Sequence, residues 1–104
     1  MATKLSLVAF LRASAGNEEA LGRRLLALVD ASRQEPGCIN YDVHQSNDDP
    51  AVWVMYENWR SREDLDSHFE TPYLQAFLSD SHGLLEGEFG MHYLTMKSAP
   101  ASGD

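Results

Sequence analysis

The sequence has little positive charge, one cysteine and no long apolar run. Its 104 residues carry 8 Lys and Arg against 16 Asp and Glu, which gives a formal net charge of −8. Nucleic-acid and anionic membrane surfaces select for clustered Lys and Arg, so this balance argues against both partners. No apolar stretch approaches the roughly 18 residues of a membrane-spanning helix. The lone Cys38 has no partner for an intrachain disulfide, so we expect a protein of the reducing cytoplasm.

Several sequence motifs with a known chemistry are also missing. There is no G-x-G-x-x-G, no G-x-x-x-x-G-K-[ST] and no G-x-S-x-G, which argues against nucleotide-binding folds and serine hydrolases. The four histidines are dispersed, and the single i, i+4 pair of Asp64 and His68 is a weak metal signal. We therefore expect neither a metal nor a bound cofactor.

The residues that are present predict one globular α+β domain. Hydrophobic residues make up 43% of the chain, ten of its residues are aromatic, and apolar periodicity alternates between strand and helix spacing. We expect a domain over 1–96 and a disordered tail over 97–104. The predicted strands are 4–13, 38–46, 51–59 and about 90–96, and the predicted helices are 17–33 and 61–78, the second restarting at Pro72. This strand–helix–strand–strand–helix–strand order is that of the ferredoxin-like βαββαβ fold.

Both faces of the predicted sheet are apolar. In the first strand Leu7 and Leu11 point to one side, while Val8 and Phe10 point to the other. Two helices cover only one face of such a sheet, so the second face needs a partner. A second copy of the chain is the simplest partner, and we predict a homodimer.

The third strand and the second helix bring together the most suggestive residues. Glu57 shares a strand face with large apolar side chains, and burial there is costly unless the carboxylate is paired. His68 lies in the apolar stripe of the helix, so Glu57 and His68 are predicted to meet between sheet and helix. One interpretation is a structural core pair. The other is a general base, with Glu57 orienting His68.

Several large side chains surround this predicted pair. Aromatic residues are common in cores, so they either pack the interior or form the walls of a ligand site. The candidate substrate-binding residues are Trp53, Met55, Trp59, Tyr73 and Phe77.

A set of short motifs, taken together, resembles one family over residues 4 to about 96. The motifs are Glu35-Pro36-Gly37-Cys38-Ile39-x-Tyr41, then Asp49-Pro50, then Tyr56-Glu57-Asn58-Trp59-x-Ser61, then His68 and Thr71-Pro72-Tyr73. Their order and spacing resemble those of the antibiotic biosynthesis monooxygenase family. The resemblance implies a dimeric α+β barrel, in which two ferredoxin-like sheets face each other with the helices outside. It also implies a cavity between sheet and helices in each subunit.

The family resemblance covers several activities. Its members include cofactor-independent monooxygenases of quinols or polyketides, haem-degrading enzymes and an isomerase that processes autoinducer-2. The polyketide enzymes share the tryptophan at Trp59 but carry an asparagine and a tyrosine at the positions of Met55 and Leu65. Their oxygenation mechanism is therefore not carried over as a whole.

The haem-degrading branch differs more strongly. Its asparagine, tryptophan and haem-ligating histidine fall on Ala9, His68 and about Leu78 of this chain. The Glu57…His68 pattern is closer to the quinol monooxygenase and autoinducer-processing branches, although Tyr73 stands where those branches often carry histidine.

The leading hypothesis from the sequence is a cofactor-independent monooxygenase acting on a small aromatic quinol. His68 would remove the phenolic proton and Glu57 would orient it. One alternative is an isomerase or other proton-transfer enzyme that uses the same pair without oxygen. Another is a non-catalytic dimeric module that binds a small ligand.

Overall fold

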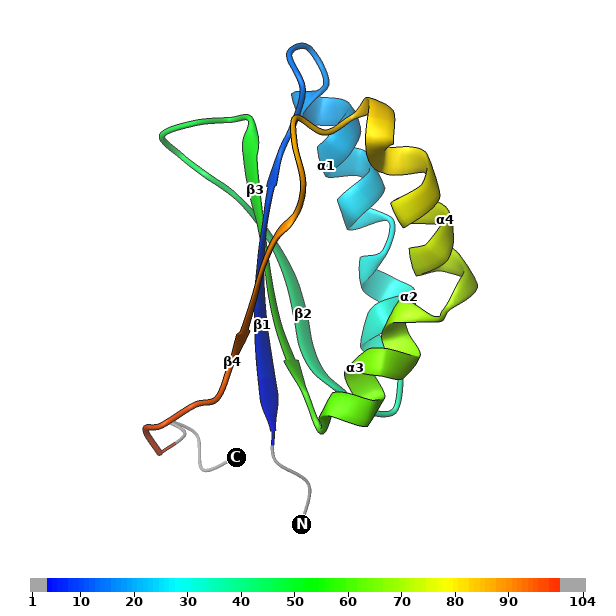
Figure 1. Cartoon of the computed structure of the whole chain (residues 1–104), viewed down its shortest axis with the longest axis vertical. Coiled ribbons are helices and arrows are strands. Elements are labelled where there is room, and N and C mark those ends of the chain that lie inside the picture. Colours follow the sequence, from blue (N-terminus) through cyan, green and yellow to red (C-terminus); the bar gives the residue numbers. More distant parts are fainter. Residues whose placement is uncertain (1–3, 100–104) are drawn as a thin grey trace.

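The chain folds into a four-stranded antiparallel sheet with its helices layered on one face (Figure 1). The computed structural model describes residues 4–99. Within that range none of the helices is long and apolar enough to cross a membrane. The elements in chain order are β1 (Leu5–Arg12), α1 (Glu18–Leu26), α2 (Val29–Arg33), β2 (Cys38–Gln45), β3 (Val52–Trp59), α3 (Arg62–Phe69), α4 (Pro72–Asp80), the short 3-10 turn η1 (Ser81–Gly83) and β4 (Gly90–Leu94).

The strand order is β2-β3-β1-β4, which confirms the predicted ferredoxin-like α+β architecture. The register pairs Leu7 of β1 with Glu57 of β3, and Glu57 with Tyr41 of β2, so these three side chains share the inner face. Because side chains alternate along a strand, Leu11, Met55 and the other inner residues form the floor against which the helices pack. The expected tail over 97–104 includes 100–104, which lie outside the described residues.

The first predicted helix is divided into α1 and α2. The backbone N–H of Leu28 donates to the carbonyl of Leu25, three residues back, at 3.1 Å, which tightens the chain between the two helices. Leu21, Leu25 and Leu28 are all buried, so the apolar stripe continues across the break. The periodicity therefore predicted the buried face correctly and missed the turn within it.

The second helical stretch begins and restarts as its sequence predicts. The hydroxyl of Ser61 accepts the backbone N–H of Asp64 at 3.2 Å and caps α3. Thr71 caps α4 in the same way, and Pro72 occupies its first turn, where a missing N–H costs nothing. The two helices are therefore separate elements, and α3 ends directly beside the inner face of the sheet.

The outer face of the sheet carries no helix of the described chain (Figure 1). Val8 pairs with Tyr56 and Phe10 with Val54 on this face. Phe10 is 44% exposed and Tyr56 is 38% exposed, which is unusual for large apolar side chains at the centre of a sheet. The two-sided apolar pattern read from the sequence is thus present in the structure.

Gly22 of α1 lies in close contact with Trp53 of β3, and a substitution there tests how tightly the helix packs against the sheet. A Cβ added there would lie 2.4 Å from the far edge of the Trp53 ring. Gly22→Ala is expected to lower the free energy of unfolding by about 1–3 kcal/mol through overpacking. Urea denaturation measures this change. Gly83→Ala, where an added Cβ has nothing within 4 Å, is the matched control. Stabilisation of Gly22→Ala by the roughly 1 kcal/mol of helix propensity alone would contradict the close packing.

Candidate active site

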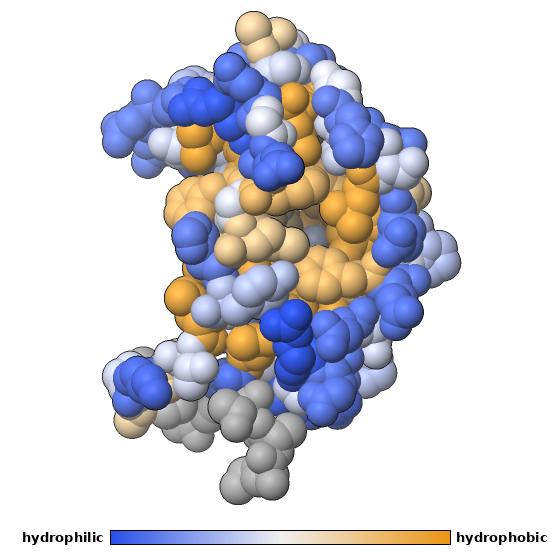
Figure 2. Space-filling model, viewed as in Figure 1, coloured by the Kyte–Doolittle hydropathy of each residue, from blue (hydrophilic) through white to orange (hydrophobic). Residues whose placement is uncertain are grey.

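A small cavity lies between the inner face of the sheet and the helices. Figure 2 shows apolar side chains gathered there around a hollow. The cavity volume is about 40 Å³. That is room for a few water molecules, and far less than the roughly 150 Å³ that holds a benzene ring. Apart from Tyr41, Glu57 and His68, its lining is apolar and includes Leu7, Met55, Phe69, Phe77, Phe89 and Met91.

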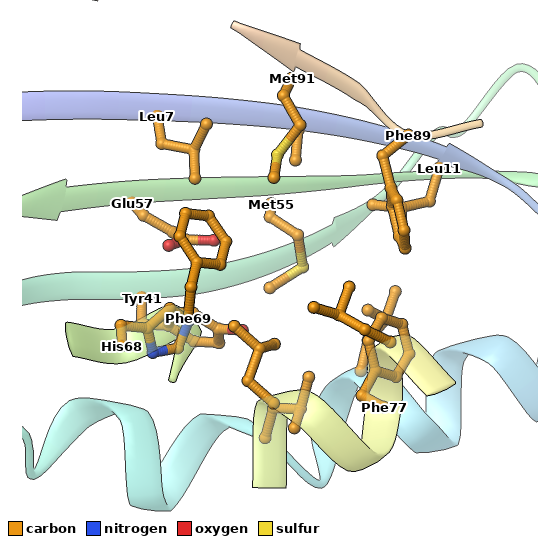
Figure 3. A pocket seen from close by; sticks show the side chains of 15 residues that line it. Leu7, Leu11, Tyr41, Met55, Glu57, His68, Phe69, Phe77, Phe89 and Met91 are labelled. Atoms are coloured by element: carbon orange, nitrogen blue, oxygen red, sulfur yellow. The ribbon is translucent and has the colours of Figure 1, made fainter. Parts of the chain in front are cut away.

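The polar and apolar parts of the lining are separated. Figure 3 shows Tyr41, Glu57 and His68 at one end, Phe77 and Phe89 at the other, and the methionines between them. The rings of Phe77 and Phe89 lie 6.2 Å apart between centroids and close the apolar end. Phe89 and Met91 also line an outer groove of about 480 Å³. These two side chains therefore separate the cavity from the surface.

His68 is held by Glu35. The Nδ1 atom of His68 lies 2.8 Å from Oε2 of Glu35, and the phenol of Tyr73 donates to the same oxygen. Because a carboxylate only accepts, Nδ1 carries the proton and Nε2 presents its lone pair. His68 is 1% exposed and lines the cavity, and Nε2 has no hydrogen-bond partner within residues 4–99. The arrangement leaves a basic nitrogen available to a ligand.

The position of Glu35 depends on the turn that follows α2. A Cβ on Gly37 would lie 2.2 Å from Cγ of Asp64, so only glycine lets this turn approach the start of α3 so closely. The carbonyl of Gly37 accepts the backbone N–H of Arg60 at 2.8 Å and fixes the approach. The Glu-Pro-Gly turn thereby brings Glu35 beside His68, although 33 residues separate them in the sequence.

Glu57 has a different partner from the one predicted. Its Oε1 accepts the indole N–H of Trp59 at 2.9 Å. No hydrogen bond joins Glu57 to His68 among the described residues, so the predicted orienting partner was wrong. The reason is tertiary: Glu57 is fixed by the tryptophan two residues along its own strand, while Glu35 reaches His68 from the turn. Glu57 lines the cavity, and its second oxygen has no partner in the described chain.

Burial controls the ionisation of this end of the cavity. It raises the pKa of Glu57 to about 7, with the Trp59 hydrogen bond opposing the shift and the nearby Glu35 adding to it. Burial also lowers the pKa of His68, and the Glu35 hydrogen bond and charge act against that fall. The pKa of Tyr73 is raised to about 12 by burial and by Glu35. At neutral pH His68 is therefore an uncharged imidazole, and the Glu57 carboxyl is partly protonated.

The remaining predicted wall residues divide into three groups. Met55 and Phe77 line the cavity. Trp59 and Tyr73 do not line it, and instead support His68, with ring centroids 4.6 and 6.5 Å from the imidazole. Trp53 is not in the cavity, because it packs over Gly22 and borders a separate surface hollow. Strand alternation predicted correctly that Trp53 lies on the inner face of the sheet. It could not predict that the cavity does not extend as far along β3 as Trp53.

The sequence analysis missed Glu35 as a site residue, along with Tyr41, Phe69, Phe89 and Met91. An acidic residue just before a Pro-Gly turn was the only local signal for Glu35. Within residues 4–99 no group of three or more His, Cys, Asp and Glu side chains is placed to hold a metal ion. Asp64, the possible metal partner of His68, instead pairs with Arg60 at 2.8 Å.

Three proteins are similar to this chain in sequence, and two of them are named as putative monooxygenases. The chain is 40% identical over 57 residues to an uncharacterized protein of Synechocystis, sll1783, covering 55% of this chain and 39% of that one. It is 39% identical over 54 residues to "Putative monooxygenase Rv0793" of Mycobacterium tuberculosis, covering 52% of each. It is 28% identical over 79 residues to "Putative monooxygenase YcnE" of Bacillus subtilis, covering 76% of this chain and 83% of that one. The matches thus span only 39% and 52% of the length of the first two relatives.

Solved structures share the whole architecture. The crystal structure of PA3566 from Pseudomonas aeruginosa superposes with a TM-score of 0.89 at 37% identity, covering 94% of this chain and 98% of that one. The structure of Rv0793 gives a TM-score of 0.87 at 26% identity, with coverage of 92% and 97%. The family model described as antibiotic biosynthesis monooxygenase matches residues 5–79. With most of the chain matched and the fold shared, this protein belongs to the antibiotic biosynthesis monooxygenase family.

Proposed function

We propose that the chain is a cofactor-independent monooxygenase that oxidises a small aromatic quinol. One observation carries the proposal: two polar atoms without a hydrogen bond to any described residue belong to side chains that line an apolar cavity. They are Nε2 of His68 and the second oxygen of Glu57, each without a hydrogen-bond partner in the described chain. A buried pair kept only for packing normally has its polar atoms satisfied. Unpaired groups that line a cavity are better explained by a ligand that completes them.

His68 is the proposed base. It is uncharged at neutral pH because burial lowers its pKa, so Nε2 is free to accept the phenolic proton. The Glu35 carboxylate at Nδ1 stabilises the imidazolium that forms, and Tyr73 holds that carboxylate in place. Glu35 thus takes the positioning role that the sequence assigned to Glu57.

The substrate supplies the electrons. A deprotonated quinol is electron-rich and reduces dioxygen directly; one oxygen atom enters the ring and the other leaves as water. The quinol becomes a hydroxyquinone, so it provides all four electrons that the two oxygen atoms accept. The protein contributes the base and an apolar enclosure that keeps bulk water from the reacting ring.

A ring enters this cavity only when side chains move. About 40 Å³ is too small for an aromatic ring, and Phe89 and Met91 stand between the cavity and the outer groove. Phe89 lies just before β4, outside the paired strand, which makes it the side chain best placed to swing aside. We propose entry from the groove past Phe89.

Two other functions use the same features. A proton-transfer isomerase would need the His68 base but no oxygen, and the absence of oxygen consumption would favour it. A non-catalytic ligand-binding module is favoured by the small volume of the cavity. Oxygen uptake with a responsive substrate distinguishes the monooxygenase from both.

We also propose that the protein works as a cytoplasmic homodimer joined through the outer face of the sheet. The exposed Phe10 and Tyr56, with Val8 and Val54 beside them, form an apolar patch that no described helix covers. A second copy of the same patch is the simplest cover. The single Cys38, which is half-buried, supports the reducing compartment.

His68→Ala tests the base. With a panel of small quinols and anthrones in an oxygen electrode, the variant is expected to lose about 10²- to 10⁴-fold in rate, because it lacks the proton acceptor. Ser67→Ala, which changes an exposed residue of α3 next to His68, is the control and should keep the wild-type rate. Full oxygen uptake by His68→Ala with every active substrate would rule out this assignment.

Glu35→Gln tests the positioning of His68. The charge and hydrogen bond of Glu35 both raise the pKa of His68, so their loss is expected to lower that pKa further. Titration of the His68 ring by NMR measures the shift, and the acidic limb of the oxygen-uptake profile should move to lower pH with it. Tyr73→Phe keeps the carboxylate charge and should shift the pKa less. An unchanged His68 titration in Glu35→Gln would show that Glu35 has only a packing role.

Phe10→Asp tests the dimer. A charge at the centre of the apolar patch must be desolvated on association, so the variant is expected to sediment as a monomer at micromolar concentration. Leu26→Asp is the matched control, because Leu26 is 58% exposed on α1 and lies away from the sheet face. A wild-type protein that is already monomeric at that concentration would contradict the proposal.

A further inference from the structure

Glu57 is a buried acid that has no role in the mechanism proposed for His68. We propose that Glu57 donates a hydrogen bond to the substrate, and that the substrate carries its two oxygen functions on adjacent ring carbons, as a catechol does. This inference deepens the proposed function and rests on it, because it needs a substrate bound beside His68. It makes Glu57 a catalytic residue in its own right, separate from the Glu35–His68 pair.

The geometry places the free atoms of Glu57 and His68 at one end of the cavity. The indole of Trp59 contacts both: its N–H donates to Glu57 at 2.9 Å, and its ring lies 4.6 Å from that of His68. Tyr41 closes the same end, paired in register with Glu57 and 5.3 Å from the His68 ring. Both groups line this end of the cavity, and we place the oxygen-bearing edge of the substrate there (Figure 3).

The opposite end of the cavity limits where oxygen atoms fit. Phe77 and Phe89 close that end, with Met55 and Met91 between the two ends (Figure 3). A para-quinol that placed one hydroxyl at His68 would bury its second oxygen among these apolar side chains without a partner, which is unfavourable. Adjacent oxygens avoid this, since one faces His68 and the other faces Glu57.

The protonation state of Glu57 suits a donor. Burial raises its pKa to about 7, so below that pH the carboxyl keeps its proton. With Oε1 accepting from Trp59, the O–H is directed from the other oxygen, which has no protein partner in the described chain. The titratable groups around it are Tyr41 and Cys38 on β2, His68 on α3 and Glu35 in the turn before β2; β1 contributes the apolar Leu7.

The proton balance of the step is simple. One substrate hydroxyl gives its proton to Nε2 of His68. The neighbouring oxygen accepts a hydrogen bond from Glu57, which keeps its proton and stabilises the negative charge that develops on the ring. Glu57 is neither oxidised nor consumed.

Anaerobic calorimetry with catechol and hydroquinone tests this inference without turnover. The wild-type protein is expected to bind catechol about tenfold more tightly than hydroquinone at pH 6, the value of one good hydrogen bond. By pH 8 Glu57 is ionised and can only accept from the second catechol hydroxyl, so the comparison at pH 6 is the one that tests the donor. Equal affinity for the two diols at pH 6 would overturn the proposal, and binding of neither would overturn the placement of any ligand in this cavity.

Two variants of Glu57 separate the donor from a packing role. Glu57→Gln keeps an N–H donor and does not titrate, so it should retain the catechol preference at both pH values. Glu57→Leu has no donor and should lose the preference while still binding the ring. Glu63→Gln, at an exposed position of α3, is the matched control and should behave as wild type. Thermal unfolding checks that each variant is folded.

The outcomes distinguish this inference from the proposed function. If the catechol preference survives in Glu57→Leu, Glu57 is not the donor. If the preference is lost in Glu57→Gln as well as in Glu57→Leu, the donor role is also overturned. Oxygen uptake that does not depend on His68 overturns the monooxygenase mechanism instead, and leaves the binding comparison intact.

Discussion

The carboxylate of Glu35 joins three segments of the helical layer: the turn after α2, α3 and α4. Its Oε2 accepts hydrogen bonds from His68 on α3 and Tyr73 on α4, and Glu35 itself belongs to the turn that links α2 to β2. Gly37 makes this possible, because the turn lies so close to Asp64 that no side chain fits. The tautomer of His68, the orientation of its ring and the polar end of the cavity all depend on this shared oxygen.

Glu35 and Glu57 have different partners and different burial. Glu35 receives two donors, whereas Glu57 receives only the indole of Trp59. For Glu57 one hydrogen bond does not offset burial, and its pKa rises from 4.5 to about 7. That difference corresponds to roughly 3 kcal/mol in favour of the neutral form. The cavity thus combines a base backed by a carboxylate with an acid that keeps its proton near neutral pH.

The small volume of the cavity links its chemistry to motion. A cavity of about 40 Å³ has room for a few water molecules beside His68, but it admits a ring only if Phe89 or its neighbours move. The ring contact between Phe77 and Phe89 is the one to be broken, and it lies at the end farthest from the titratable groups (Figure 3). In the proposed mechanism, entry and proton transfer therefore lie at opposite ends of one small space.

The sequence by itself determined the fold, the two apolar faces of the sheet, the caps at Ser61 and Thr71, and the burial of Glu57 and His68. These features follow from local signals: alternation in strands, helical periodicity, and the cost of placing polar groups in an apolar stripe. Only the tertiary structure decided that Glu35 holds His68, that Trp59 holds Glu57, and that Trp53 lies outside the cavity. Those outcomes depend on how closely a turn approaches a helix and how far along a strand the helices extend. Distances between elements that are remote in the chain set both, and no local pattern encodes them.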